Sequence, residues 1–416
     1  MSPPRIGIWL IGAKGGVAAT TIVGLAALRK GLIDTTGLVS ELPDFAGLHL
    51  ADWSDFAVGG HDIRCANLFD EAMRMASVSR AIDPNTIEAC REEIDQIGGN
   101  IRPGTVINVG ETITDLAEGE SVGRNETPRS AIERVQADLQ QFIEANQLKQ
   151  LIVVNVASTE PPVDVASLPA SWDEMSVLLD KEDACPLPAS SLYAIAALDA
   201  GHAYINFTPS LGSTPPAICE LAELRKTCHV GRDGKTGETL LKSTLAPMFA
   251  QRNLQVMSWV GHNIFGNMDA VVLDDPTNKA TKVTSKDQLL GDIFGYQPQT
   301  LISIEYIKSL GDWKTAWDHI HFKGFLGTPM TMQFTWQGCD SLLAAPLVLD
   351  LVRFTERARR DGHVGVLTFL ASFFKSPLGV QECRFAQQFQ MLQRWAEGLD
   401  HKAATAGRAP GVERQS

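Results

Sequence analysis

The sequence predicts an α/β fold whose first domain is Rossmann-like. Residues 5–11 (RIGIWLI) form a short apolar run rich in β-formers, the glycine-rich stretch GAKGGVAATT follows, and TIVGLAALRKGL then has a helical pattern. Strand, glycine-rich turn and helix in this order are typical of the first unit of a dinucleotide-binding fold. An amphipathic helix expected over 130–147 leads into an apolar strand over 151–158, and this alternation predicts a mostly parallel sheet.

The remaining elements follow from local patterns. LVSE, which ends at Glu41, is predicted to be the second strand. From about residue 206 the chain is rich in turns and then helical, and LLKSTLAPMFAQR has helical apolar spacing that Pro247 is expected to kink or break. Residues 341–360 predict a strongly apolar helix with a basic end, and the tail from residue 403 is expected to be disordered. A chain of 416 residues suggests two or three domains.

Composition narrows the class of protein. The net charge of −13 argues against a nucleic-acid partner, because phosphate backbones need a basic surface. Seven scattered cysteines without a CxxC pattern indicate free thiols in a reducing compartment, and Cys228–His229 has no second pair that would complete a metal site. We see neither a signal-peptide pattern nor an apolar run of the ~18 residues that a membrane span needs. The expectation is a cytoplasmic protein with no membrane partner and no metal.

The glycine-rich turn is the candidate cofactor site. Gly12, Gly15 and Gly16 would allow a tight turn and a close approach of the backbone to the pyrophosphate of a dinucleotide such as NAD. Their spacing is G-x-x-G-G and not G-x-G-x-x-G, so a plain structural turn is the alternative. Either Asp62 or Glu41 is the acid that would bind the ribose diol, and either is otherwise an ordinary acidic side chain.

A second glycine-containing stretch, GRDGKTGET, invites comparison with the phosphate-binding loop of NTPases. The first glycine of that motif would fall at position 229, which is histidine, so the match fails and an NTPase is rejected. Small residues with Asp233 and Lys235 before a helix can still hold one phosphate through backbone N–H groups and the ammonium group. An exposed turn is the alternative.

Four lysines are candidate catalytic or anion-binding residues. Lys282 and Lys286 are four residues apart and would share one helical face, where mutual repulsion would favour a base or an anion site. Lys314 lies in GDWK and Lys375 follows two phenylalanines. The alternatives are a solvated basic face for the first pair and side chains that reach the surface for the other two.

Seven motifs in order resemble the myo-inositol-1-phosphate synthase family. They are YIN at 204–206, GRDGKTG at 231–237, HNIFGNMD at 262–269, the Lys282/Lys286 pair, GDWK at 311–314, CDSLLAAP at 339–346 and TFLASFFKSPLG at 368–379. The resemblance is densest from Tyr204 to Gly379 and extends to the N-terminal turn. It implies an NAD-dependent isomerase that converts D-glucose 6-phosphate to inositol 3-phosphate by oxidation at C5, enolisation, intramolecular aldol closure and re-reduction, with NAD bound throughout.

The resemblance also implies roles for individual residues. Lys282 would transfer the C5 proton, Lys375 would stabilise the oxyanion, and Lys286 and Lys314 would hold the phosphate. The phosphate loop would consist of Asp233, Lys235, Thr236 and Gly237. Substrate would be positioned by Asn263, Asn267 and Asp269, and Asp340 would lie near the nicotinamide.

The implied architecture is a Rossmann-like NAD-binding domain with an inserted α/β domain for catalysis and oligomerisation. Its parts are residues 1–205, the inserted 206–338, a return to the first domain over 339–402, and the tail 403–416. A homotetramer is implied. Alternatives are a sister cyclase acting on another hexose phosphate such as fructose 6-phosphate, a non-catalytic NAD-binding scaffold, and an ordinary NAD-dependent dehydrogenase.

Two departures from the family pattern affect these expectations. Val17 and Ala18 replace the asparagines that often follow the glycine pair in the cofactor turn. Glu238 stands where glutamine is common, and this places a negative charge near the expected phosphate. A monovalent or divalent cation beside the phosphate would help to offset that charge.

Overall fold

The larger of two sheets is parallel and forms the centre of the protein. The computed structural model describes residues 5–119, 126–181, 185–266 and 289–406. Seven strands pair in parallel in the order β11-β6-β5-β4-β1-β2-β3. Their bounds are β1 Ile6–Ile11, β2 Phe56–Asp62, β3 Ile101–Pro103, β4 Gln150–Asn155, β5 Ala203–Asn206, β6 Cys228–Gly231 and β11 Gly365–Val366. The α/β prediction is confirmed.

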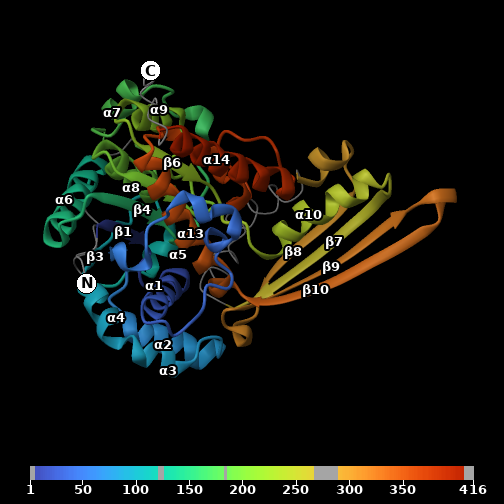
Figure 1. Ribbon diagram of the computed structural model, residues 1–416, viewed down its shortest axis with the longest axis horizontal. Coiled ribbons are helices and arrows are strands. Elements are labelled where there is room, and N and C mark those ends of the chain that lie inside the picture. Colours follow the sequence, from blue (N-terminus) through green and yellow to red (C-terminus); the bar gives the residue numbers. More distant parts are fainter. Residues whose placement is uncertain (1–4, 120–125, 182–184, 267–288, 407–416) are drawn as a thin grey trace, which may run out of the picture.

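Helices cover both faces of this sheet (Figure 1). Alternate side chains of β1 point to opposite faces, so Ile8 and Leu10 enter one core while Trp9 and Ile11 enter the other. The first core is covered by α1 Gly16–Arg29, α2 Leu68–Ser79, α3 Pro84–Ala89, α4 Arg91–Gly98, α13 Asp340–Arg360 and α14 Phe385–Ala406. The second is covered by α5 Glu111–Asp115, α6 Pro128–Asn146, α7 Trp172–Leu178, α8 Ala189–Asp199 and α9 Pro216–Leu224. Burial on both faces explains why β1 is apolar throughout.

A smaller mixed sheet is inserted between β6 and β11. Its strands are β7 Gln255–Phe265, β8 Gln299–Tyr306, β9 Trp313–Lys323 and β10 Pro329–Cys339, in the order β10-β9-β7-β8. Helix α10, Gly237–Gln251, packs Phe249 against Trp259 and Phe322 on one face of this sheet. Figure 1 shows the long strands β7, β9 and β10 extending away from the larger sheet.

Several local predictions are confirmed and others are not. Helices α6 and α13 and strand β4 lie where the patterns place them, whereas α10 continues through Pro247, where a kink or a break was expected. The LVSE strand is wrong, because Val39–Glu41 is a short 3-10 helix and β2 is the second strand. The backbone N–H groups of Val39 and Ser40 donate to the carboxylate of Asp350 in α13, so no neighbouring strand is needed to satisfy them.

The change from one sheet to the other occurs after α10. The sequence suggests a boundary at residue 206, but β6 lies beyond it and still pairs with β5 in the larger sheet. The chain returns to the larger sheet with α13, which packs along α1, and then adds β11 beside β6. Helix α14 ends at Ala406, beyond the start of the tail expected from residue 403. Within the described residues, no helix has both the length and the apolar character to cross a membrane.

Candidate active site

The glycine-rich turn lies at the carboxyl end of β1, where the strand order reverses between β1 and β4. Gly12 has φ +80°, and a Cβ there would lie 2.8 Å from the Cα of Ala157, so only glycine fits. Gly15 is the N-cap of α1, and among the described residues no side chain caps this terminus and no acid lies in its first turn. An uncapped helix N-terminus at a switch point suits the pyrophosphate of a dinucleotide.

The residues after the turn differ in what they can contact. A Cβ on Gly16 would lie 2.7 Å from Ser341 Oγ, so the start of α13 closes over the start of α1. Val17 packs partly against the core, and Ala18 is fully buried in it. The side chain of Ala18 therefore packs in the core beneath the helix start, and only the backbone at this position can contact a cofactor.

The structure separates the two candidate ribose acids. Asp62 ends β2 beside the turn, where its Oδ2 accepts from the backbone N–H of Lys14 at 2.6 Å and its Oδ1 from that of Arg64 at 2.8 Å. Glu41 instead forms an ion pair with Arg353 of α13 at 2.5 Å. Of the two acids, Asp62 is therefore the one that lies beside the glycine-rich turn. A cavity of about 510 Å³ opens beside Lys14 and the segment after β2.

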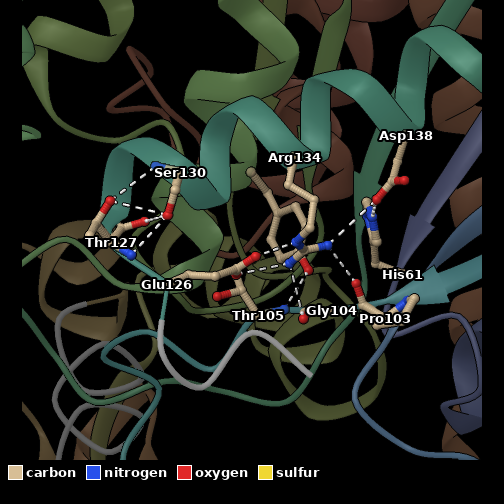
Figure 2. Close-up of polar contacts among 10 residues, drawn as sticks. His61, Pro103, Gly104, Thr105, Glu126, Thr127, Ser130, Arg134 and Asp138 are labelled. Carbon is tan, nitrogen blue, oxygen red and sulfur yellow. Dashed lines mark hydrogen bonds and ion pairs between the residues drawn. The ribbon is translucent and has the colours of Figure 1, made fainter. Parts of the chain in front are cut away.

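A buried histidine braces the end of β2 behind Asp62 (Figure 2). Trp9 Nε1 can only donate, so His61 Nδ1 accepts its hydrogen bond at 2.8 Å and the ring proton lies on Nε2, which donates to Asp138 at 3.0 Å. Burial lowers the pKa of His61, which favours this neutral form. Arg134 links Asp138 to two carbonyl oxygens at the end of β3. The network holds the carboxyl ends of β2 and β3 in place.

Lys375 and Asp233 form the first lysine–carboxylate pair. Lys375 Nζ lies 2.8 Å from Asp233 Oδ1, and the backbone N–H of Lys375 donates to the Asp233 carbonyl at 2.7 Å. Asp233 follows β6 with φ +62°, and Lys375 follows the 3-10 helix Thr368–Phe373. Both side chains are less than one fifth exposed, so the pair is only partly screened by water.

The other residues of the expected phosphate loop contact different elements. Lys235 is buried, and its ammonium group donates to Gln388 of α14. Burial lowers the pKa of Lys235 to about 8. Thr236 is the N-cap of α10 and Gly237 begins that helix with φ +54°. The helix N-terminus thus faces the loop, while the Lys235 ammonium is engaged with α14.

Lys314 and Asp340 form a second, looser pair. Lys314 Nζ lies 3.9 Å from Asp340 Oδ1 and 5.0 Å from the ring centre of Phe265. Asp340 begins α13 directly before Ser341, so this pair lies beside the glycine-rich turn. Asp312 fixes the junction, because its carboxylate accepts from the backbone N–H and the hydroxyl of Ser341, each at 3.0 Å.

Asn263 is the one expected substrate-positioning side chain that the structure describes. It lies on β7, is 1% exposed, and donates through Nδ2 to Glu238 Oε2. Asn267, Asp269, Lys282 and Lys286 lie outside the described residues. Lys242, one turn along α10, places its Nζ 2.6 Å from Glu238 Oε1. Its positive charge offsets the negative charge of Glu238, for which the sequence had suggested a bound cation.

Three of these residues were not expected from the sequence. Lys242 is four residues after Glu238, and this spacing is the one at which glutamate and lysine pair along a helix. Asp312 lies in GDWK two residues before Lys314, and its position just before a strand does not indicate that it accepts hydrogen bonds from the first turn of α13. His61 directly precedes Asp62, and the sequence around it carried no signal of its partners Trp9 and Asp138.

Comparison with known proteins identifies the family. The family model described as myo-inositol-1-phosphate synthase matches residues 6–396. An inositol-3-phosphate synthase of Bacteroides thetaiotaomicron is 31% identical over 395 residues, covering 90% of each chain. An inositol-3-phosphate synthase of Saccharomyces cerevisiae is 28% identical over 435 residues, covering 90% of this chain and 81% of the yeast protein.

Solved structures agree at the level of the fold. A crystal structure of inositol-3-phosphate synthase from Caenorhabditis elegans aligns with a TM-score of 0.84 at 24% identity, covering 96% of this chain and 86% of that one. A myo-inositol-1-phosphate synthase-related protein from Thermotoga maritima aligns with a TM-score of 0.78 at 24% identity, covering 94% and 98%. Together with the family match, these findings show that the chain belongs to the myo-inositol-1-phosphate synthase family, enzymes built on a Rossmann-like NAD-binding domain.

Proposed function

We propose that this protein is an NAD-dependent cyclase that converts D-glucose 6-phosphate to 1D-myo-inositol 3-phosphate. One observation carries the proposal. Two lysine–carboxylate pairs, Lys375–Asp233 and Lys314–Asp340, lie on the side of the larger sheet where the strands have their carboxyl ends, and the glycine-rich turn lies on the same side. The names of the relatives support the same reaction. A dehydrogenase alone needs one proton-transfer group, whereas enolisation and aldol closure need several cationic groups around the sugar.

The residues around the turn fit NAD. Gly12, Gly15 and Gly16 would hold the pyrophosphate at the start of α1, and Asp62 would accept from the adenosine ribose. Bound NAD would supply reversible hydride transfer at C5 of the sugar. Asp340 lies next to Ser341, which touches the Gly16 position, and this supports a place for Asp340 near the nicotinamide.

The lysines would act on the sugar. Lys375 is held by Asp233, and its ammonium group would stabilise the oxygen at C5 as negative charge develops there. Lys314, beside Asp340, would bind the phosphate together with Lys286. Lys282 would carry the C5 proton. Thr236 and Gly237 would offer backbone N–H groups at the start of α10 to the same phosphate.

The smaller sheet supports a homotetramer. Its face opposite α10 carries Leu301 and Trp317, which are 55% and 51% exposed. Neighbouring strands put these two side chains on the same face as Val260 of β7. The same face also carries polar side chains such as His262 and His319. Exposed apolar side chains among polar ones are typical of a subunit interface, and a second copy of the chain is the partner that we infer. All seven cysteines are free, which supports a reducing compartment such as the cytoplasm.

The test measures whether inositol phosphate forms and whether NADH accumulates. Purified protein is incubated with D-glucose 6-phosphate labelled with ¹³C and with NAD⁺, and the mixture is followed by ¹³C NMR and by absorbance of NADH. The proposal expects an inositol phosphate without net NADH. Net accumulation of NADH would show a dehydrogenase, and turnover of fructose 6-phosphate but not of glucose 6-phosphate would show a sister cyclase.

A further inference from the structure

A buried charged cluster lies between α10 and the smaller sheet. Glu238 and Lys242 of α10 are 2% and 1% exposed, and their ion pair is 2.6 Å long. The Glu238 carboxylate lies against β7 and near a second carboxylate, since a Cβ on Gly261 would lie 2.7 Å from Glu238 Oε1 and 3.1 Å from Asp318 Oδ1. Lys242 Nζ also lies 5.8 Å from the ring centre of Trp259. Buried charges at such short distances are held in one geometry.

This geometry dictates how the side-chain amide of Asn263 is turned. Lys242 Nζ lies 2.6 Å from Glu238 Oε1, so Glu238 is the carboxylate of an ion pair, and an ionised carboxylate can only accept hydrogen bonds. The group of Asn263 that faces Glu238 must therefore be the donor, Nδ2, as the structure shows. The amide orientation follows from chemistry and does not depend on distinguishing nitrogen from oxygen.

The carbonyl oxygen of the Asn263 amide, Oδ1, is the atom that can bind a ligand. Asn263 Oδ1 is buried and has no hydrogen-bond partner among the residues that the structure describes. A buried carbonyl oxygen without a donor is costly, so a site of this kind is completed by a bound group. Residue 238 directly follows Gly237, the residue that opens α10 at the expected phosphate loop, so the substrate is the nearest candidate.

We propose that Glu238 is a positioning residue that makes Asn263 accept a hydrogen bond, through Oδ1, from a hydroxyl group of the sugar phosphate. The inference rests on the proposed function, because that function supplies the polyhydroxylated substrate. Lys242 has a supporting part, since it supplies the charge that keeps Glu238 an acceptor. The direction of this hydrogen bond would select a substrate with a hydroxyl donor at that carbon over a deoxy or fluoro analogue.

The test exchanges donor and acceptor between the two positions. In Asn263→Asp a second carboxylate faces Glu238, and we expect kcat/KM for glucose 6-phosphate to fall by at least about 100-fold. In Glu238→Gln the new amide can donate, Asn263 can turn over, and a loss of about tenfold is expected. In the double variant Glu238→Gln/Asn263→Asp, glutamine donates and aspartate accepts, so kcat/KM should return to within about tenfold of the wild type.

Controls separate this inference from the proposed function. Glu133→Gln, an exposed change on α6, should leave kcat/KM unchanged, and the melting temperature of each variant checks that it folds. Binding of glucose 6-phosphate to the NAD-loaded proteins is also measured by calorimetry and should show the same loss and rescue. An active wild type whose Asn263→Asp variant is unimpaired, or is not rescued in a folded double variant, overturns the inference alone. A wild type that neither binds nor converts glucose 6-phosphate overturns both.

Discussion

We predict that Glu160 makes the stability of the protein depend on pH near neutrality. It follows β4, in the loop that also brings Ala157 against Gly12, and is 8% exposed. Its Oε1 accepts from the backbone N–H of Ser190 at 2.8 Å, in the first turn of α8, and its Oε2 accepts from the Ser190 hydroxyl. Burial outweighs these hydrogen bonds and raises the pKa of Glu160 from 4.5 to about 7.

The sign and the size of the effect follow from this pKa. The folded protein binds the Glu160 proton more tightly than the unfolded chain does, so protonation favours folding. The contribution is complete below about pH 4.5 and is lost as the pH rises through about 7. A change from 4.5 to about 7 corresponds to about 3 kcal/mol in total, of which about 2 to 3 kcal/mol would be lost between about pH 5 and 8.

The assay compares wild type with Glu160→Gln, which has nearly the same shape and no titrating group. Urea unfolding is followed by tryptophan fluorescence between about pH 5 and 8, at one NAD concentration, because bound ligand adds its own stabilisation. The free energy of unfolding of the wild type should fall relative to that of the variant as the pH rises. Other groups such as Asp350, whose pKa burial raises to about 6, are common to both proteins and cancel in the difference.

The matched control is Glu133→Gln, at an exposed position on α6. Its unfolding free energy should run parallel to that of the wild type at every pH. If the difference between wild type and Glu160→Gln changes by less than about 0.5 kcal/mol over the range, the reasoning about Glu160 is wrong.

Four further predictions concern the site and the assembly. Lys375→Met should lower kcat by about 100-fold or more while the NAD content stays at the wild-type level, and near-normal turnover would exclude its role at the oxyanion. Lys282→Ala should abolish turnover and spare NAD binding, which fluorescence titration with NADH can verify. Gly12→Ala would force a Cβ to 2.8 Å from Ala157 Cα at φ +80° and should weaken NAD binding by at least about tenfold by calorimetry, so an unchanged Kd would contradict the site. If the protein forms the proposed tetramer, Trp317→Glu should convert it to smaller species in sedimentation velocity, and an intact tetramer would place the interface elsewhere.

Local patterns were sufficient for most of the fold. The apolar run of β1, the glycine turn and the helical spacing of α1, α6 and α13 each depend on neighbours in the chain, and the structure confirms all of them. The strand prediction for LVSE is wrong because the backbone N–H groups of Val39 and Ser40 are satisfied by Asp350, which is 311 residues from Val39. No local pattern records such a partner.

The sequence was sufficient to choose the residue types of the site, and their motif order placed them in a family. It could not choose their partners. Asp233 and Lys375 are 142 residues apart and meet only because β6 and β11 are neighbours in the larger sheet. Likewise Glu238, which in sequence is an uncompensated charge beside a phosphate loop, is neutralised by Lys242 and turned toward Asn263. Backbone conformation is decided largely by adjacent residues, whereas the charge state and direction of a buried side chain depend on groups that the tertiary structure brings together.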